Sequence, residues 1–152
     1  MKIMFSFTAV ILLLSGCVAT GINYKDLPAI SSEKGTVFFL RQKKSVGFFV
    51  CKTVVVDEAE IGCLKNGGFF RVPVEPGLHT IGFLVDDGIF GSKVVGSQIN
   101  IEVGKTYYFE YSPSFQGVCG AGVNSICMSF ASNMYLIKEA AALKFLSDLN
   151  ES

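Results

Sequence analysis

Five cysteines and a single histidine are the residues of this 152-residue chain best suited to chemistry of their own. A cysteine thiolate acts as a nucleophile or a metal ligand, or pairs in a disulfide, and histidine acts as a general base near neutral pH. Cys17 lies alone near the N-terminus, whereas the other five residues are spread over the remaining sequence: Cys51, Cys63, His79, Cys119 and Cys127. The spacing therefore separates Cys17 from an even set of four cysteines.

Cys17 ends a short apolar segment at the start of the chain. Lys2 supplies a positive charge, Phe5 to Leu14 form an apolar run, and the small residues Ser15 and Gly16 precede the cysteine. This is the three-part order of a secretory signal peptide. The apolar run is too short to cross a bilayer, which takes ~20 apolar residues. Residues 1–16 are therefore predicted to be a signal peptide.

The sequence Leu-Ser-Gly-Cys at residues 14–17 resembles the lipobox of bacterial lipoproteins. The resemblance implies that the peptide is cut before Cys17 and that a lipid such as palmitate is placed on its sulfur. The alternatives are an ordinary secreted protein in which Cys17 is coincidental, and an uncleaved membrane anchor. Because Val18 rather than aspartate follows, the family's sorting rule favours the outer membrane, facing the periplasm, in a cell with two membranes.

The four remaining cysteines are predicted to form disulfides. An exported chain folds in an oxidising compartment, and an even number of cysteines there favours disulfides. We expect Cys51 to pair with Cys63 and Cys119 with Cys127, because each pair flanks an apparent hairpin turn. Across an ideal two-residue turn the first pair does not fall directly opposite, so it requires a bulge or a longer turn. A zinc site is the alternative, but the close cysteine pairs of structural zinc sites are missing.

His79 offers the other route to chemistry. A catalytic histidine needs a nucleophile and an orienting carboxylate beside it, and the sequence does not single out either one. His79 follows Pro76-Gly77 at the start of a predicted strand, where we expect its ring to hydrogen-bond neighbouring backbone. An envelope hydrolase or a thiol-redox protein that uses His79 or a free cysteine is the alternative to a non-enzymatic role.

The charges of the chain balance, and its formal net charge is +0. This balance gives no reason to expect a nucleic-acid partner, and no pattern indicates a metal ion or another cofactor. The basic cluster Arg41-Gln42-Lys43-Lys44 is interpreted as the solvated tip of a hairpin, with a contact to lipid headgroups as the alternative.

The elements that carry these residues are predicted to be short strands. Gly21 to Lys34 is polar and lacks periodicity, so residues 17–34 are predicted to form the lipidated N-terminus and a flexible tether. Short β-rich runs separated by turn signals follow. These runs predict strands over residues 36–41, 48–56, 60–64, 69–74, 79–85, 94–103, 106–111 and 128–137.

We therefore expect an all-β domain over residues 35–138, an antiparallel two-sheet β-sandwich of the Ig-like or PEGA-like kind. Residues 139–149 combine strong helix formers with one apolar face and predict a short C-terminal helix packed on the domain. A helix that docks a partner is the alternative.

Several short stretches resemble the DUF2846 family, which comprises bacterial lipoproteins and envelope proteins of unknown function. The order of the stretches agrees with the family over roughly residues 35–138, and the resemblance implies an envelope location and a sandwich fold without implying a reaction. The family usually has Asp-Gly in its first turn, where this chain has Asp57-Glu58. The matching stretches are Val37–Arg41, Val56-Asp57 with Ile61-Gly62, Leu64–Phe70, Pro76–Ile81 and Val103–Tyr108.

The functional expectation is a membrane-anchored lipoprotein of the cell envelope that acts as a non-enzymatic structural or protein-binding module. The membrane is reached through the lipid on Cys17. The expected partner is another envelope protein, bound through an edge strand or the exposed hairpin loops.

Overall fold

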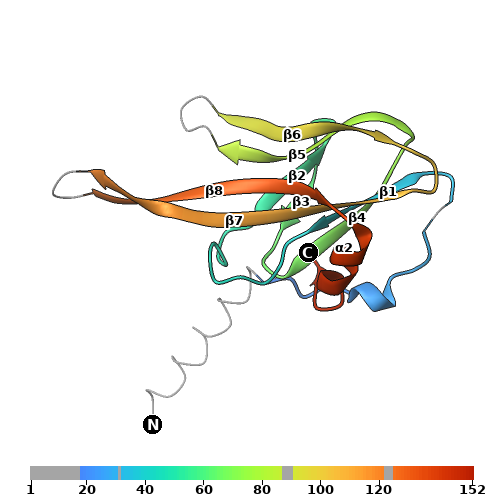
Figure 1. Cartoon of the computed structure of the whole chain (residues 1–152), viewed down its shortest axis with the longest axis horizontal. Helices are drawn as coiled ribbons and strands as arrows, with labels where there is room; N and C mark the ends of the chain where they lie inside the picture. Colours follow the sequence, from blue (N-terminus) through green and yellow to red (C-terminus); the bar gives the residue numbers. More distant parts are fainter. Residues whose placement is uncertain (1–17, 31, 87–90, 122–124) are drawn as a thin grey trace, which may run out of the picture.

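The chain folds into two β-sheets that pack face to face, with a short helix on the outer face of one of them (Figure 1). The computed structural model describes residues 18–30, 32–86, 91–121 and 125–152, without the side chains of residues 86 and 115–131. The all-β sandwich expected from the sequence is confirmed. Its strands are β1 (Gly35–Leu40), β2 (Lys52–Val56), β3 (Ala59–Leu64), β4 (Gly68–Val74), β5 (Gly77–Asp86), β6 (Ser92–Ile101), β7 (Thr106–Ala121), β8 (Ser125–Ile137) and β9 (Asn150–Glu151).

One sheet has the strand order β8-β7-β1-β4-β9, and the other has the order β3-β2-β5-β6. Most neighbouring strands are antiparallel, but β1 pairs with β7 and β4 pairs with β9 in parallel. Parallel neighbours require a crossover. For β1 and β7 the crossover includes β5 and β6, which belong to the other sheet, before the chain returns beside β1.

Strand β1 is buried along both faces and lies at the centre of the domain. Side chains alternate across a strand, so Val37 and Phe39 enter the core between the sheets, whereas Phe38 and Leu40 join a second cluster on the outer face. The inner core is completed by Val54, Val56, Leu64, Val74, Ile81, Phe83, Ile101, Phe109 and Tyr111.

Helix α2 (Glu139–Leu146) covers the outer face of the five-stranded sheet. Ala142, Leu146 and Leu149 are buried in one cluster with Phe38. The helix predicted over residues 139–149 ends three residues earlier, because the chain then turns so that β9 pairs with β4. The sequence does not indicate β9, since a two-residue strand leaves no periodic pattern.

Residues 18–30, predicted to be part of a flexible tether, lie against the domain instead. The 3-10 helix η2 (Tyr24–Asp26) brings the Tyr24 ring to 5.9 Å from that of Phe38 and 6.5 Å from that of Phe69. Leu27 packs against the same outer cluster. The prediction fails because α2 leaves part of this apolar face open, and burying apolar side chains there stabilises the segment.

Strands β7 and β8 form a longer ribbon than the sequence predicts. The apolar pattern predicts a strand over residues 106–111, but β7 continues to Ala121 because its main chain stays paired with β8. In Figure 1 this ribbon and the β5–β6 ribbon extend toward the same side of the molecule.

The connection between β1 and β2 also differs from the prediction. The sequence predicts a strand over residues 48–56, whereas the ladder between β2 and β3 begins at Lys52. Phe48, Phe49 and Val50 are 51%, 57% and 49% exposed in the connecting loop. These three residues have high strand propensity, but propensity reflects packing against neighbouring strands. The strand pairing that the structure describes begins only after them, so they stay in the loop.

Candidate functional site

The turn between β2 and β3 positions the carboxylate of Asp57. Asp57 and Glu58 have φ angles of 49° and 68°, so the hairpin keeps the positive-φ turn that favours glycine, at a cost of about 1 kcal/mol per residue. From this turn Asp57 Oδ1 accepts a hydrogen bond from Thr80 N at 2.8 Å. Asp57 Oδ2 lies 2.5 Å from His79 Nδ1.

His79 connects this carboxylate to the turn that precedes β5. Its Nε2 lies 2.8 Å from the carbonyl oxygen of Glu75, so the doubly protonated ring donates one hydrogen bond to each partner. The Asp57 hydrogen bond raises the pKa of His79, and the Glu75 carbonyl raises it further against opposing desolvation. The hydrogen bonds from His79 and the Thr80 N–H lower the pKa of Asp57.

The His79–Asp57 pair has the geometry of the orienting half of a catalytic triad. In a triad the other ring nitrogen faces a hydroxyl or thiol, but here Nε2 faces a backbone carbonyl. That nitrogen must donate to the carbonyl, so it is not available to accept a proton from a nucleophile. The pair therefore joins the β2–β3 turn to the start of β5. The contact with backbone was expected from the sequence, and the contact with Asp57 was not.

The pH dependence of stability tests this pair. The raised pKa of His79 contributes stability that is full below its unfolded pKa of about 6.5 and is lost as pH rises through the folded pKa. The lowered pKa of Asp57 contributes stability above about pH 4 that is lost as pH falls through its folded pKa. Urea denaturation at pH 5.5 and 9 is expected to show that His79→Gln lowers the free energy of unfolding more at pH 5.5. The difference is expected to be less than about 1 kcal/mol, because the carboxylate of Asp57 is half exposed. An equal effect at both pH values would contradict the ionic pair.

The sequence interprets Arg41 as part of a solvated hairpin tip, but the structure gives it a different role. Its side chain is 1% exposed. Nη1 donates to the carbonyl oxygens of Val50 and, at 3.1 Å, Leu64, and Nη2 donates to that of Gly47 at 2.6 Å. The guanidinium also lies 5.5 Å from the centre of the Tyr111 ring. One sequence signal predicts this position: Arg41 follows Val37 and Phe39 at strand spacing and so points to the inner core.

A hollow of about 130 Å³ lies beside Arg41. It is smaller than typical ligand pockets, which measure roughly 300–1,000 Å³. Tyr111 and Ser132 line it and hydrogen-bond each other at 2.9 Å. Its polar groups therefore already serve the fold. The remaining lining residues are Gly47, Phe49, Val50, Lys52 and Pro113.

Cys51 and Cys63 form a disulfide, as the sequence predicts, with their Cα atoms 5.4 Å apart. The expected bulge is present, because Val54 pairs with Gly62 and the next pair is Val55 with Glu60. This bond removes both thiols from the zinc and thiol-redox alternatives. Within the described parts of the chain, no three His, Cys, Asp or Glu side chains are grouped to hold a metal ion.

Cys119 and Cys127 lie directly opposite each other in the β7–β8 ladder. The sequence predicts a loop between them, but strand pairing continues past both residues to Ala121 and Ser125. Their side chains lie outside those that the structure describes, so the second disulfide stays a prediction that this register favours.

Cys17 and the predicted signal peptide lie outside the described residues. Among the helices that are described, none has both the length and the hydropathy needed to cross a membrane. Lipidation of Cys17 stays a prediction.

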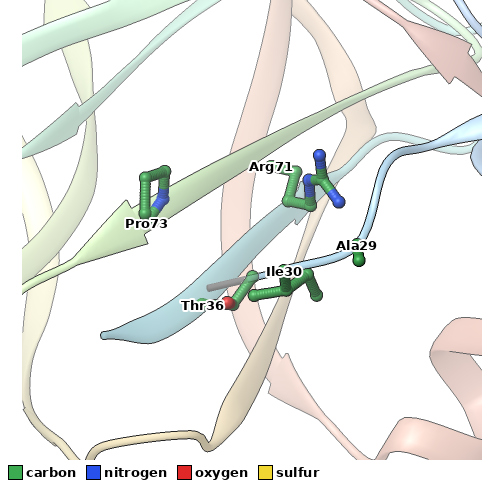
Figure 2. Close-up of a pocket in the computed structure, with 5 residues that line it drawn as sticks. All are labelled: Ala29, Ile30, Thr36, Arg71 and Pro73. Carbon is green, nitrogen blue, oxygen red and sulfur yellow. The ribbon is translucent and has the colours of Figure 1, made fainter. Parts of the chain in front are cut away.

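A hollow of about 190 Å³ lies where the N-terminal segment crosses the five-stranded sheet (Figure 2). Ala29 and Ile30 come from the segment, Thr36 from β1, and Arg71 and Pro73 from β4. Arg71 donates to the carbonyl oxygen of Pro28 at 2.6 Å, so it holds the segment in place. None of the lining side chains is a nucleophile or base suited to catalysis at neutral pH.

A second hollow of about 360 Å³ runs along the same segment and shares Ala29, Ile30 and Arg71 with the first. Tyr108 lines it and donates to Glu139 Oε1 at 3.3 Å. Burial raises the pKa of the Tyr108 phenol, which therefore stays protonated and does not act as a base. Both hollows follow the seam between the segment and the sheet.

Comparison with known proteins identifies a family. The model of the family described as "Protein of unknown function (DUF2846)" matches residues 31–123. No curated protein and no solved structure matches the chain. The matched range includes strands β1 to β7, the disulfide, the His79–Asp57 pair and Arg41. The chain therefore belongs to the DUF2846 family.

Proposed function

We propose that this protein is a lipid-anchored component of the cell envelope, facing the periplasm from the outer membrane, that binds another envelope protein without catalysing a reaction. The leader and the Leu-Ser-Gly-Cys sequence at residues 14–17 support the anchor. The pairing of His79 with a backbone carbonyl and the disulfide of Cys51 with Cys63 support a binding role over the hydrolase and thiol-redox alternatives.

The observation that carries the binding role is the open edge of β6. This ten-residue strand lies at the end of its sheet, and nearly all of its side chains are exposed or partly exposed. The outer main-chain groups of an edge strand can pair with an extended segment of a partner. Ser97, Gln98 and Asn100 give this edge a polar surface, which suits a partner recognised mainly through main-chain hydrogen bonds.

Two experiments test the two parts of this proposal. Palmitate labelling in cells is expected to mark the wild type and to be lost in Cys17→Ser, and labelling that persists in the variant would refute the anchor. A photoreactive amino acid at Gln98 on β6 is expected to crosslink to one envelope protein. The same group at Lys144, exposed on α2, serves as the control. Equal crosslinking at both positions would refute docking on the β6 edge.

A further inference from the structure

We propose that the loop over residues 42–50 is a membrane contact, with Phe48, Phe49 and Val50 seated in the interface of a phospholipid bilayer. The inference rests on the lipid anchor proposed for Cys17 and adds an orientation to it. The domain lies against the membrane with this loop facing the lipid, instead of standing off the surface on a tether.

The anchor joins the domain beside this loop. Val18 forms a bridge with Asn66, and the side-chain oxygen of Asn66 accepts a hydrogen bond from the Lys44 N–H at 3.0 Å. Cys17 directly precedes Val18 in the sequence, and consecutive Cα atoms are about 3.8 Å apart. Acyl chains on Cys17 therefore begin beside the loop and bring it to the bilayer surface.

The loop exposes an apolar surface. Three consecutive apolar residues are each about half exposed, and the Phe48 and Phe49 rings meet edge to face at 5.1 Å. An exposed apolar group of this kind marks an interaction site. Phenylalanine is among the residues that interfacial segments place at the boundary between headgroups and acyl chains.

Hydrogen bonds and a disulfide hold the loop in shape. The Val50 N–H donates to the Gly47 carbonyl at 3.0 Å, and Arg41 donates to the carbonyl oxygens of both residues. The disulfide at Cys51 fixes the point where the loop enters β2. The exposed rings are therefore presented on a fixed frame, which lowers the entropic cost of placing them in a bilayer.

The charges around the loop favour an anionic lipid surface. Three lysines lie in the loop or at the adjacent start of β2, and two carboxylates lie in the same region. The resulting positive excess is attracted to anionic headgroups. The lysines are Lys43, Lys44 and Lys52, and the carboxylates are Glu110, which accepts from Gln42, and Asp148, which lines one hollow with Lys43.

The experiment uses the absence of tryptophan from the chain. Phe49→Trp places a single fluorophore in the loop, and Leu78→Trp places the control at a residue that is 65% exposed at the far end of the β2–β5 pair. Each full-length variant is purified from cell membranes and reconstituted in vesicles of phosphatidylethanolamine and phosphatidylglycerol. We expect the emission of Phe49→Trp to shift to shorter wavelength and to be quenched by brominated lipid, while that of Leu78→Trp is quenched only by aqueous iodide.

Equal responses of the two variants to brominated lipid would overturn the proposal. Protection of Phe49→Trp from iodide without quenching by brominated lipid would also overturn it, because a protein partner or a second copy would then cover the loop. Mass spectrometry of the same samples reports the acyl chains on Cys17. Missing acyl chains would refute the anchor, and the quenching data would still decide the position of the loop.

Discussion

Replacing Arg41 with methionine is expected to lower the free energy of unfolding by about 4 kcal/mol. The substitution keeps an unbranched apolar stem but removes the donors to the carbonyl oxygens of Gly47, Val50 and Leu64. A buried polar group that loses its partner costs about 1–3 kcal/mol, and Leu64 is fully buried while the other two sites are partly exposed. Urea denaturation followed by circular dichroism measures the effect.

Arg71→Met is the matched control, because this arginine is partly exposed and donates to the single carbonyl of Pro28 at 2.6 Å. We expect it to cost at most about 1 kcal/mol. Arg41→Lys is expected to fall between wild type and Arg41→Met, since an ammonium group keeps the charge but lacks the planar fork. An Arg41→Met variant as stable as Arg71→Met would contradict the role assigned to Arg41.

Replacing both members of the Cys51–Cys63 disulfide with serine is expected to lower the free energy of unfolding by about 3 kcal/mol. The bond closes a loop with a sequence separation of 12, and the loss of that constraint on the unfolded chain gives this magnitude. The measurement is urea denaturation without reductant. Alkylation of the unfolded, unreduced wild type controls for the bond: labelling of Cys51 or Cys63 would contradict it.

The two effects are expected to be coupled. Arg41 binds the carbonyl oxygens of Val50 and Leu64, which adjoin Cys51 and Cys63 in the sequence. The guanidinium and the disulfide therefore join the same two chain segments, and groups that act on one contact are not additive. The combined variant should lose less stability than the sum of its parts. Full additivity would show that the two act independently.

Much of the sandwich follows from short-range patterns. The continuous run of strand-forming residues in Val37–Leu40 predicts β1, and the turn residues Asn66-Gly67 and Pro76-Gly77 separate the strands that follow. Because side chains alternate across a strand, the neighbours Tyr108 and Phe109 face opposite sides of β7, and they join different clusters. Such patterns succeed because each strand must present one set of side chains to a core whatever its neighbours are.

The candidate site depends more on contacts between residues that are distant in the sequence. The spacing of Cys51 and Cys63 predicts both the disulfide and its bulge, since hairpin geometry is local. The Asp57–His79 contact joins residues 22 positions apart and depends on β2 pairing with β5, which no local signal specifies. The sequence groups Arg41 with the basic residues that follow it, although its strand spacing to Val37 and Phe39 predicts that it faces the core.

The sequence alone predicts the strand-rich class, most strand positions, the Cys51–Cys63 pairing and the membership of the DUF2846 family. These depend on period, turn chemistry and short spacings, which are carried by neighbouring residues. The tertiary structure was needed to establish that residues 18–30 pack on the domain, that β1 and β7 are parallel, and that Arg41 binds the carbonyl oxygens of Gly47, Val50 and Leu64. Each of these depends on which surface the other elements leave open, and that is settled only when distant segments meet.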